Sequence, residues 1–246
     1  MPKLSPRLES ILKGVKRRLL FVLVAFGVGA SLTWQYRVDI FGYLFAPAGG
    51  QLSGTGKPIF TGPTEMFSIT ISLVMKGGLA LAIPVLVYFI YDLFKPMFGK
   101  QARRTVLLFL WLMLIFYIGG MAFAYYVLLP AGLGFLLNFG TDIATPAIRI
   151  TEYMELAMAM LFWLGIVFEI PILMMLLAKL RLVSHTQFKK VRPYVPIAAA
   201  FLSMIITPTP DAVTMLLVAG PIWLLYEAGV FLAWLVRPKV RALFQK

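Results

Sequence analysis

The sequence is 246 residues long and 61 % hydrophobic, with a mean hydropathy of +0.88. This composition excludes an ordinary soluble domain, because apolar runs of about 20 residues recur along the chain and each is long enough to cross a bilayer as a helix. The absence of cysteine and the presence of a single histidine, His185, exclude disulfides, thiolate metal sites and a histidine metal cluster.

The chain begins with a basic stretch, residues 1–18, in which apolar residues recur at helical spacing. We expect an amphipathic helix at the membrane surface that runs into the first span. Pro130 is expected to end the third span. The fifth span is short, because the distance from Pro196 to Pro208 allows only about 17 Å of helix against a hydrocarbon core of about 30 Å. The expected fold is an all-α integral membrane protein, one polytopic domain over 1–246, with six spans at residues 19–36, 68–91, 106–128, 153–178, 194–206 and 213–236.

Basic residues are concentrated on one side of this predicted topology. The N-terminal stretch, the loops before the third and fifth spans, and the tail hold nineteen Lys and Arg residues, whereas the other loops hold three. Loops rich in Lys and Arg stay in the cytoplasm, so both termini are expected there. The net charge of +13 is therefore attributed to topology, with contact to anionic lipids as the alternative, and no nucleic-acid partner is expected.

The fourth predicted span contains a carboxylate, Glu169, followed by Pro171. Glu169 lies about 15 Å inward from Lys179, which is near the bilayer centre. An acid at this depth costs about 3 kcal/mol on insertion scales and normally faces other helices or water, so Glu169 is a candidate functional contact. A hydrogen-bonded packing residue is the alternative. Glu227 on the sixth span lies at a similar depth, and the two acids could share a polar cavity or lie apart.

Enzyme classes fit the sequence poorly. His185 is expected to be a solvated residue of a cytoplasmic loop, where it cannot serve an intramembrane protease. Asp92 and Asp211 lie at span ends on opposite faces, so they do not form an intramembrane aspartyl pair. The sequence has no phosphate-binding glycine-rich loop and no metal-ligand spacing. We therefore expect no enzymatic activity and no cofactor.

Several motifs occur in the order known from one family of membrane proteins. They are Tyr117 to Tyr125 (YIGGMAFAY) through Pro130, Phe168-Glu169-Ile170-Pro171, Arg192-Pro193-Tyr194, Thr207-Pro208 with Pro210-Asp211, and Leu225-Tyr226-Glu227. With them, the chain resembles the C subunit of the twin-arginine protein translocase, the TatC family, over about residues 12–237.

The resemblance implies a function in protein export. Members of the family receive folded proteins whose signal peptides carry two consecutive arginines, and they recruit small single-span partners of the TatA and TatB type. The proton-motive force drives the export. The resemblance also implies a multi-pass protein of a prokaryotic cytoplasmic membrane, self-association, and contact of Glu169 with partners or the inserted signal peptide.

The chain departs from the family where arginine recognition is expected. The family has glutamates before the first span and between the second and third spans, whereas the aligned residues here are Gly14 and Ala102. Arginine pairs bidentately with carboxylate, so we hypothesise that Glu9 and Asp92 supply the missing acids. Ordinary helix-end charges are the alternative. The expected signal-binding residues are Glu9, Lys16, Arg18, Asp92, Arg103 and Arg104, and the expected intramembrane partner site contains Glu169, Glu227 and Asp211.

Two other functions remain open from the sequence. One is a proton- or ion-coupled transporter of small solutes with Glu169 as the carrier, although no inverted repeat is apparent. The other is a family member that has lost arginine recognition and serves as an assembly scaffold.

Overall fold

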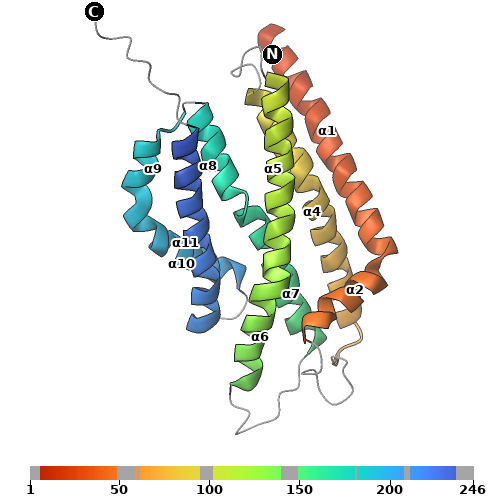
Figure 1. Ribbon diagram of the computed structural model, residues 1–246. Helices are drawn as coiled ribbons and strands as arrows, with labels where there is room; N and C mark the ends of the chain where they lie inside the picture. Colours follow the sequence, from red (N-terminus) through yellow and green to blue (C-terminus); the bar gives the residue numbers. More distant parts are fainter. Residues whose placement is uncertain are drawn as a thin grey trace, which may run out of the picture. The chain divides into compact units, whose positions relative to one another are not determined.

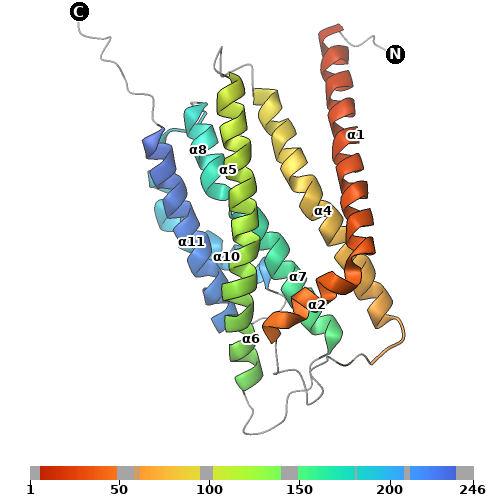
Figure 2. The ribbon, with the colours of Figure 1, turned by 45° about the vertical axis from the view of Figure 1, so that its right-hand side comes forward.

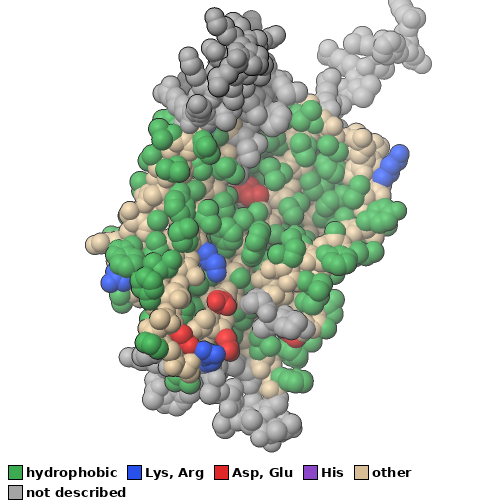
Figure 3. Space-filling view, turned by 180° about the vertical axis from the view of Figure 1, so that it is seen from behind, with side chains coloured by type: hydrophobic (Ala, Val, Ile, Leu, Met, Phe, Trp, Pro, Cys, Tyr) green, Lys and Arg blue, Asp and Glu red, His purple; other side chains and the backbone are tan. Residues whose placement is uncertain are grey.

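The computed structural model describes residues 6–48, 59, 61–94, 102–139, 149–180, 182–207 and 211–236. These residues are almost entirely helical, and the only β-type contact among them is an isolated parallel bridge between Ile59 and Arg149. Hydrophobic side chains dominate the described surface in Figure 3, as expected for helices that face lipid.

The structure confirms an all-α fold suited to a membrane. Among the described residues, five helical segments are long and apolar enough to cross a bilayer: Arg18–Gln35, Glu65–Leu86, Leu108–Leu136, Ile150–Lys179 and Ala212–Leu235. The predicted fifth span corresponds to α10 (Val195–Ile206), which has 12 residues and is shorter than these segments. The count of six spans and the cytoplasmic placement of both termini stay predictions.

The chain forms two compact units, each of which is described by itself. Unit 1 contains Met1–Phe45 and Phe60–Val106, and unit 2 contains Ala46–Ile59 and Leu107–Lys246. The expectation of one polytopic domain stays a prediction beside this division.

In unit 1, α1 (Pro6–Gln35) and α4 (Glu65–Phe94) run in opposite directions along each other (Figures 1 and 2). Small residues permit the close approach. A Cβ atom on Gly29 would lie 2.9 Å from the Leu81 Cβ, and Gly77 packs directly on Thr33. Towards the other end of the pair, the rings of Phe21 and Phe89 are 6.1 Å apart. The two helices are therefore antiparallel in register, so residues earlier in α1 contact residues correspondingly later in α4.

Two features of this part of the chain extend the sequence prediction. The amphipathic stretch and the first span form one continuous helix, α1, although the side chains of residues 6–17 lie outside the described ones. The predicted loop over 37–67 contains a helix, α2 (Arg37–Phe45), and a 3₁₀ turn, η1 (Ala46–Ala48). The guanidinium of Arg37 lies 4.9 Å from the Trp34 ring and donates to the Trp34 carbonyl oxygen at 2.9 Å, which stabilises the corner between α1 and α2.

The prediction that Pro130 ends the third span was wrong. The helix α5 (Ala102–Phe123) continues through a π-helical segment, η3 (Ala124–Leu128), into α6 (Leu129–Asn138). The Leu129 amide donates to the Ala124 carbonyl oxygen five residues earlier. This wider turn directly precedes Pro130, whose ring and missing N–H would otherwise disrupt an α-helix, so the chain continues past the proline.

The rest of unit 2 contains Ile150–Lys179, the best buried of the five apolar segments among the described residues. The helix α11 packs along α8 and α10, as the ribbon in Figure 1 also shows. The core is filled mainly by apolar side chains of the fourth predicted span, among them Met154, Met160 and Leu164. The elements, in chain order, are α7 (Ile150–Val167), α8 (Ile170–Lys179), α9 (His185–Val191), η4 (Arg192–Tyr194), α10 (Val195–Ile206) and α11 (Ala212–Leu235).

Candidate functional site

Glu169 lies at a break between two helices. The helix α7 ends at Val167, and α8 begins at Ile170. The Glu169 amide donates to the Ile166 carbonyl oxygen at 3.0 Å, three residues earlier rather than the four residues of an α-helix. Pro171 has no N–H, so it cannot donate the next α-helical hydrogen bond. The sequence predicted one unbroken span over 153–178, and Pro171 was the signal of this break.

Two glycines bring α5 against the break. A Cβ atom on Gly120 would lie 2.6 Å from the Leu164 carbonyl oxygen and 2.8 Å from the Phe168 Cβ. A Cβ atom on Gly165 would lie 2.9 Å from the Tyr117 ring. Only residues without a side chain fit at these points, so the glycines determine how closely Tyr117 approaches the broken span.

The contact encloses two polar oxygen atoms. Glu169 is 5 % exposed and Tyr117 is 4 % exposed. The Oε2 atom of Glu169 and the hydroxyl of Tyr117 are buried without a hydrogen-bond partner among the described residues. An unsatisfied buried group costs about 1–3 kcal/mol, so the pair is suited to accept a polar group that enters the membrane from elsewhere.

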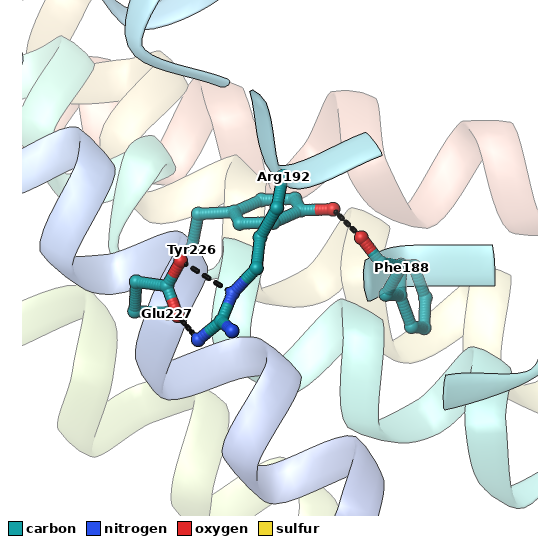
Figure 4. Close-up of polar contacts among 4 residues, drawn as sticks. All are labelled: Phe188, Arg192, Tyr226 and Glu227. Atoms are coloured by element: carbon teal, nitrogen blue, oxygen red, sulfur yellow. Dashed lines mark hydrogen bonds and ion pairs between the residues drawn. The ribbon is translucent and has the colours of Figure 1, made fainter. Parts of the chain in front are cut away.

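Glu227 is paired with Arg192, as Figure 4 shows. The Arg192 Nε donates to Glu227 Oε1 at 2.8 Å, and Nη2 donates to Oε2. The hydrogen bond to Glu227 raises the pKa of Arg192 above its usual value. Beside the pair, the hydroxyl of Tyr226 donates to the carbonyl oxygen of Phe188 at 2.9 Å. Two adjacent residues of α11 therefore hold both α9 and η4.

The structure does not bring Glu169 and Glu227 into one cavity. Gly229 of α11 packs against Pro171 and Met174 of α8, since a Cβ atom on it would lie 3.2 Å from the Pro171 Cα. Glu227 precedes Gly229 by two residues, which is about 200° around a helix, and its side chain meets Arg192 of η4 instead. Of the two arrangements left open by the sequence, the structure has the separate one.

Glu227 instead lines a hollow of about 520 Å³ between α9, η4 and the end of α11. Its polar wall also contains His185, Thr186, Lys189 and Arg192, and its apolar wall contains Val230, Phe231 and Trp234.

The expectation of a solvated His185 was wrong. His185 is 8 % exposed and is the first residue of α9. Ser184 and Gln187 form a capping box, in which the Gln187 amide donates to the Ser184 hydroxyl and the Ser184 amide donates to the Gln187 side chain. The cap starts a helix in the predicted loop, this helix packs on α11, and its first residue, His185, is buried.

Asp211 has a local structural contact. It is the N-cap of α11, where its Oδ1 accepts a hydrogen bond from the Thr214 amide at 2.7 Å, and its Oδ2 accepts one from the Thr214 hydroxyl. Among the described residues, no group of three or more His, Asp or Glu side chains is arranged to hold a metal ion.

The predicted signal-binding residues lie on helices, but only Arg18 has a described side chain. Three residues beyond the Phe21–Phe89 contact, the antiparallel register places Asp92 level with Arg18. Glu9 lies about 14 Å further along α1. Lys16 is also on α1, and Arg103 and Arg104 are in the first turn of α5. The side chains of Glu9, Lys16, Asp92, Arg103 and Arg104 lie outside the described residues.

The chain is similar to known proteins over most of its length. The family model described as Sec-independent protein translocase protein (TatC) matches residues 10–221. A TatC protein of Carboxydothermus hydrogenoformans is 30 % identical over 229 residues, which is 93 % of each chain. The Escherichia coli K12 TatC protein is 34 % identical over 218 residues, which is 88 % of this chain and 84 % of the relative.

A solved structure gives the same picture. The crystal structure of a twin-arginine translocase receptor, TatC, aligns with a TM-score of 0.80 and 29 % sequence identity, over 92 % of this chain and 98 % of that one. The resemblance inferred from the motifs is confirmed. The apolar helices are those of a multi-pass protein of the cytoplasmic membrane. The chain therefore belongs to the TatC family of Sec-independent protein translocase proteins.

Proposed function

We propose that this protein is the signal-receptor and scaffold subunit of a twin-arginine translocase, which exports folded proteins with the energy of the proton-motive force. The observation that carries the proposal is the likeness in sequence and fold, over nearly the whole chain, to a protein described as a twin-arginine translocase receptor. The protein is a component of a translocation machine rather than an enzyme. Its partners are small single-span subunits of the TatA and TatB type, signal peptides with two arginines, and further copies of itself.

The intramembrane contact is proposed to be at Glu169. Its carboxyl lies at a helix break, Tyr117 packs on α7 just before that break, and each of the two side chains has a buried oxygen atom without a hydrogen-bond partner in the described chain. A partner helix or a signal peptide that offers a polar hydrogen would satisfy these atoms. Glu227 and Asp211 are engaged within this chain, so their contribution to a partner site is proposed to be indirect, through the placement of α10 and α11.

Recognition of the two arginines is proposed to depend on Glu9 and Asp92. They stand on the paired helices α1 and α4, at the end where α1 begins and α4 ends. A guanidinium pairs bidentately with a carboxylate. The face that is proposed to receive the signal otherwise carries many cations, among them Lys16 and Arg18. A signal with two positive charges needs acids there, and the aligned family positions hold Gly14 and Ala102 instead.

Export in a strain that lacks its own C subunit tests the proposal. The protein is produced there with its own single-span partners and with a folded fluorescent reporter that carries a twin-arginine signal. We expect reporter in the periplasm, and none when the two arginines are replaced by lysines. Export that is equal for both signals, or no export despite normal protein levels in the membrane, would contradict receptor function.

A second test concerns the missing acids. Glu9→Ala together with Asp92→Ala should abolish export, whereas Glu155→Ala, at an exposed acid of α7, should leave it intact. If export survives the double substitution, the two acids are ordinary helix-end charges. If twin-arginine signals are not exported by the native protein but the chain still assembles with the single-span subunits, the protein is an assembly scaffold that has lost arginine recognition. Solute uptake by vesicles that contain this chain alone would instead support a transporter.

A further inference from the structure

The segment that joins α8 to α10 lies over a hollow beside α11. This segment, residues 184–194, comprises α9 and η4 with their N-terminal cap, and we call it the flap. The hollow under it has a volume of about 520 Å³ and opens to the surface. Of the flap's side chains, all of which are described, only His185 is buried, whereas the apolar Val191 and Tyr194 are 50 % and 67 % exposed. Little apolar surface therefore holds the flap against α11, and segments of this kind open at a low cost in free energy.

Polar contacts from one turn of α11 hold the flap in place. The Tyr226 hydroxyl donates to the Phe188 carbonyl oxygen at 2.9 Å, and the Arg192 guanidinium donates two hydrogen bonds to Glu227. The side chains of this ion pair are 47 % and 26 % exposed. Ion pairs that are exposed to this degree contribute little to stability and are weakened by salt. The contacts can therefore be released without unfolding the helices on either side.

The flap has its own internal structure and defined ends. Its capping box joins Ser184 and Gln187, both of which belong to the flap, so these hydrogen bonds persist when the flap moves. The backbone of Ser184 is extended and separates α9 from α8. At the other end, Val195 and Ala199 are buried in α10, which packs along α11. Motion of the flap therefore does not require motion of α10.

The flap, its catch and the hollow together form a conformational device. We propose that the flap is a lid that opens away from α11 while α10 stays packed, and that Tyr226 and Glu227 form the catch that keeps it closed. Opening separates Arg192 from Glu227, removes α9 from the hollow and uncovers the α11 surface at Val230. The device is a property of this chain alone, so it does not depend on the proposed receptor function.

Thiol labelling tests the lid in the full-length protein, which has no cysteine of its own. Val230 lines the hollow and is 3 % exposed, so Val230→Cys in lipid nanodiscs should react slowly with a water-soluble maleimide. Addition of Glu227→Gln should raise the rate about fivefold, the effect of losing one exposed ion pair, and Arg192→Gln should raise it by the same factor. Val218→Cys is the matched control, because Val218 is also buried on α11 but does not line the hollow.

Salt distinguishes an ion-pair catch from general loosening of the helices. An increase from about 0.1 M to 1 M salt shortens the screening length from about 10 Å to 3 Å, so Val230→Cys should react faster. This salt effect should disappear with Glu227→Gln, whereas Tyr226→Phe should raise the rate and leave the salt effect intact. An unchanged rate with Glu227→Gln would show that packing holds the flap, and a salt effect that survives Glu227→Gln would exclude the ion pair as the catch. Equal acceleration of Val218→Cys would mean that the whole bundle opens, and each of these results overturns the proposal.

Discussion

Arg192 and Glu227 lie 35 residues apart in the sequence, and the guanidinium of the first donates two hydrogen bonds to the carboxylate of the second. The next helix, α10, begins directly after η4, so the ion pair holds the start of the short helix against α11. The hydroxyl of Tyr226 secures the preceding α9 from the same turn of α11. These contacts give the acid at position 227 a structural role within this chain.

The ion pair predicts a specific pattern of non-additivity. Arg192→Gln and Glu227→Gln should each lower the apparent Tm of the protein in detergent, and the double variant should be no less stable than the worse single variant, because the second change removes a partner that is already unpaired. Additive losses would show that the two side chains act separately.

Two adjacent glycines should respond differently to a methyl group. Gly120→Ala places a Cβ 2.6 Å from the Leu164 carbonyl oxygen, a backbone atom of a helix that cannot easily shift. We therefore expect a loss of about 1–3 kcal/mol in the free energy of unfolding. Gly119→Ala is the control, since a Cβ there meets nothing within 4 Å. Unfolding of both variants by denaturant in mild detergent gives the comparison. Equal stability of the two would mean that α5 does not pack closely on the helix break.

Glu169 should matter for export more than for folding. Replacement of a buried carboxyl that has an unpaired oxygen by an apolar side chain of similar size costs little stability, so Glu169→Leu should leave the free energy of unfolding unchanged or raise it by about 1 kcal/mol. Export of a twin-arginine reporter should fall at least about tenfold, the effect of losing one hydrogen bond to a partner. Glu155→Gln on α7 is the control. A large loss of stability with Glu169→Leu would indicate a packing role.

Asp211 should act first as a helix cap. Asp211→Ala should lower the free energy of unfolding by about 1 kcal/mol, because the Thr214 amide loses its acceptor. Asp211→Asn keeps a capping oxygen and should restore most of the stability. If the asparagine variant is stable but does not export, the negative charge itself contacts a partner.

Much of the fold was predictable because the length of an apolar run is a local property. The helix pair α1 and α4, the region of α7 and α8, and α11 appear where apolar runs predicted spans. The intramembrane position of Glu169 likewise indicated a side chain turned away from lipid, and it is 5 % exposed.

The remaining features depend on contacts between distant residues. The wide turn that carries the helix past Pro130 needs a π-type hydrogen bond, and the proline alone predicts a stop. The burial of His185 depends on the tertiary packing of α9, although Ser184 and Gln187 stand in the sequence at the spacing of a capping box that starts a helix. The pairing of Arg192 with Glu227 was not predicted, because no pattern in the sequence relates a loop cation to an acid 35 residues later.

Binding of the signal peptide tests the central claim most directly. A photo-crosslinking side chain is placed at Gly14 or at Ala102, which leaves both proposed acids intact, and inverted membranes receive a twin-arginine signal peptide or its twin-lysine variant. We predict crosslinks with the arginine peptide only, their loss with Glu9→Gln and Asp92→Asn together, and their retention with Glu155→Gln. Equal crosslinks for both peptides, or none, would contradict a receptor function for this protein.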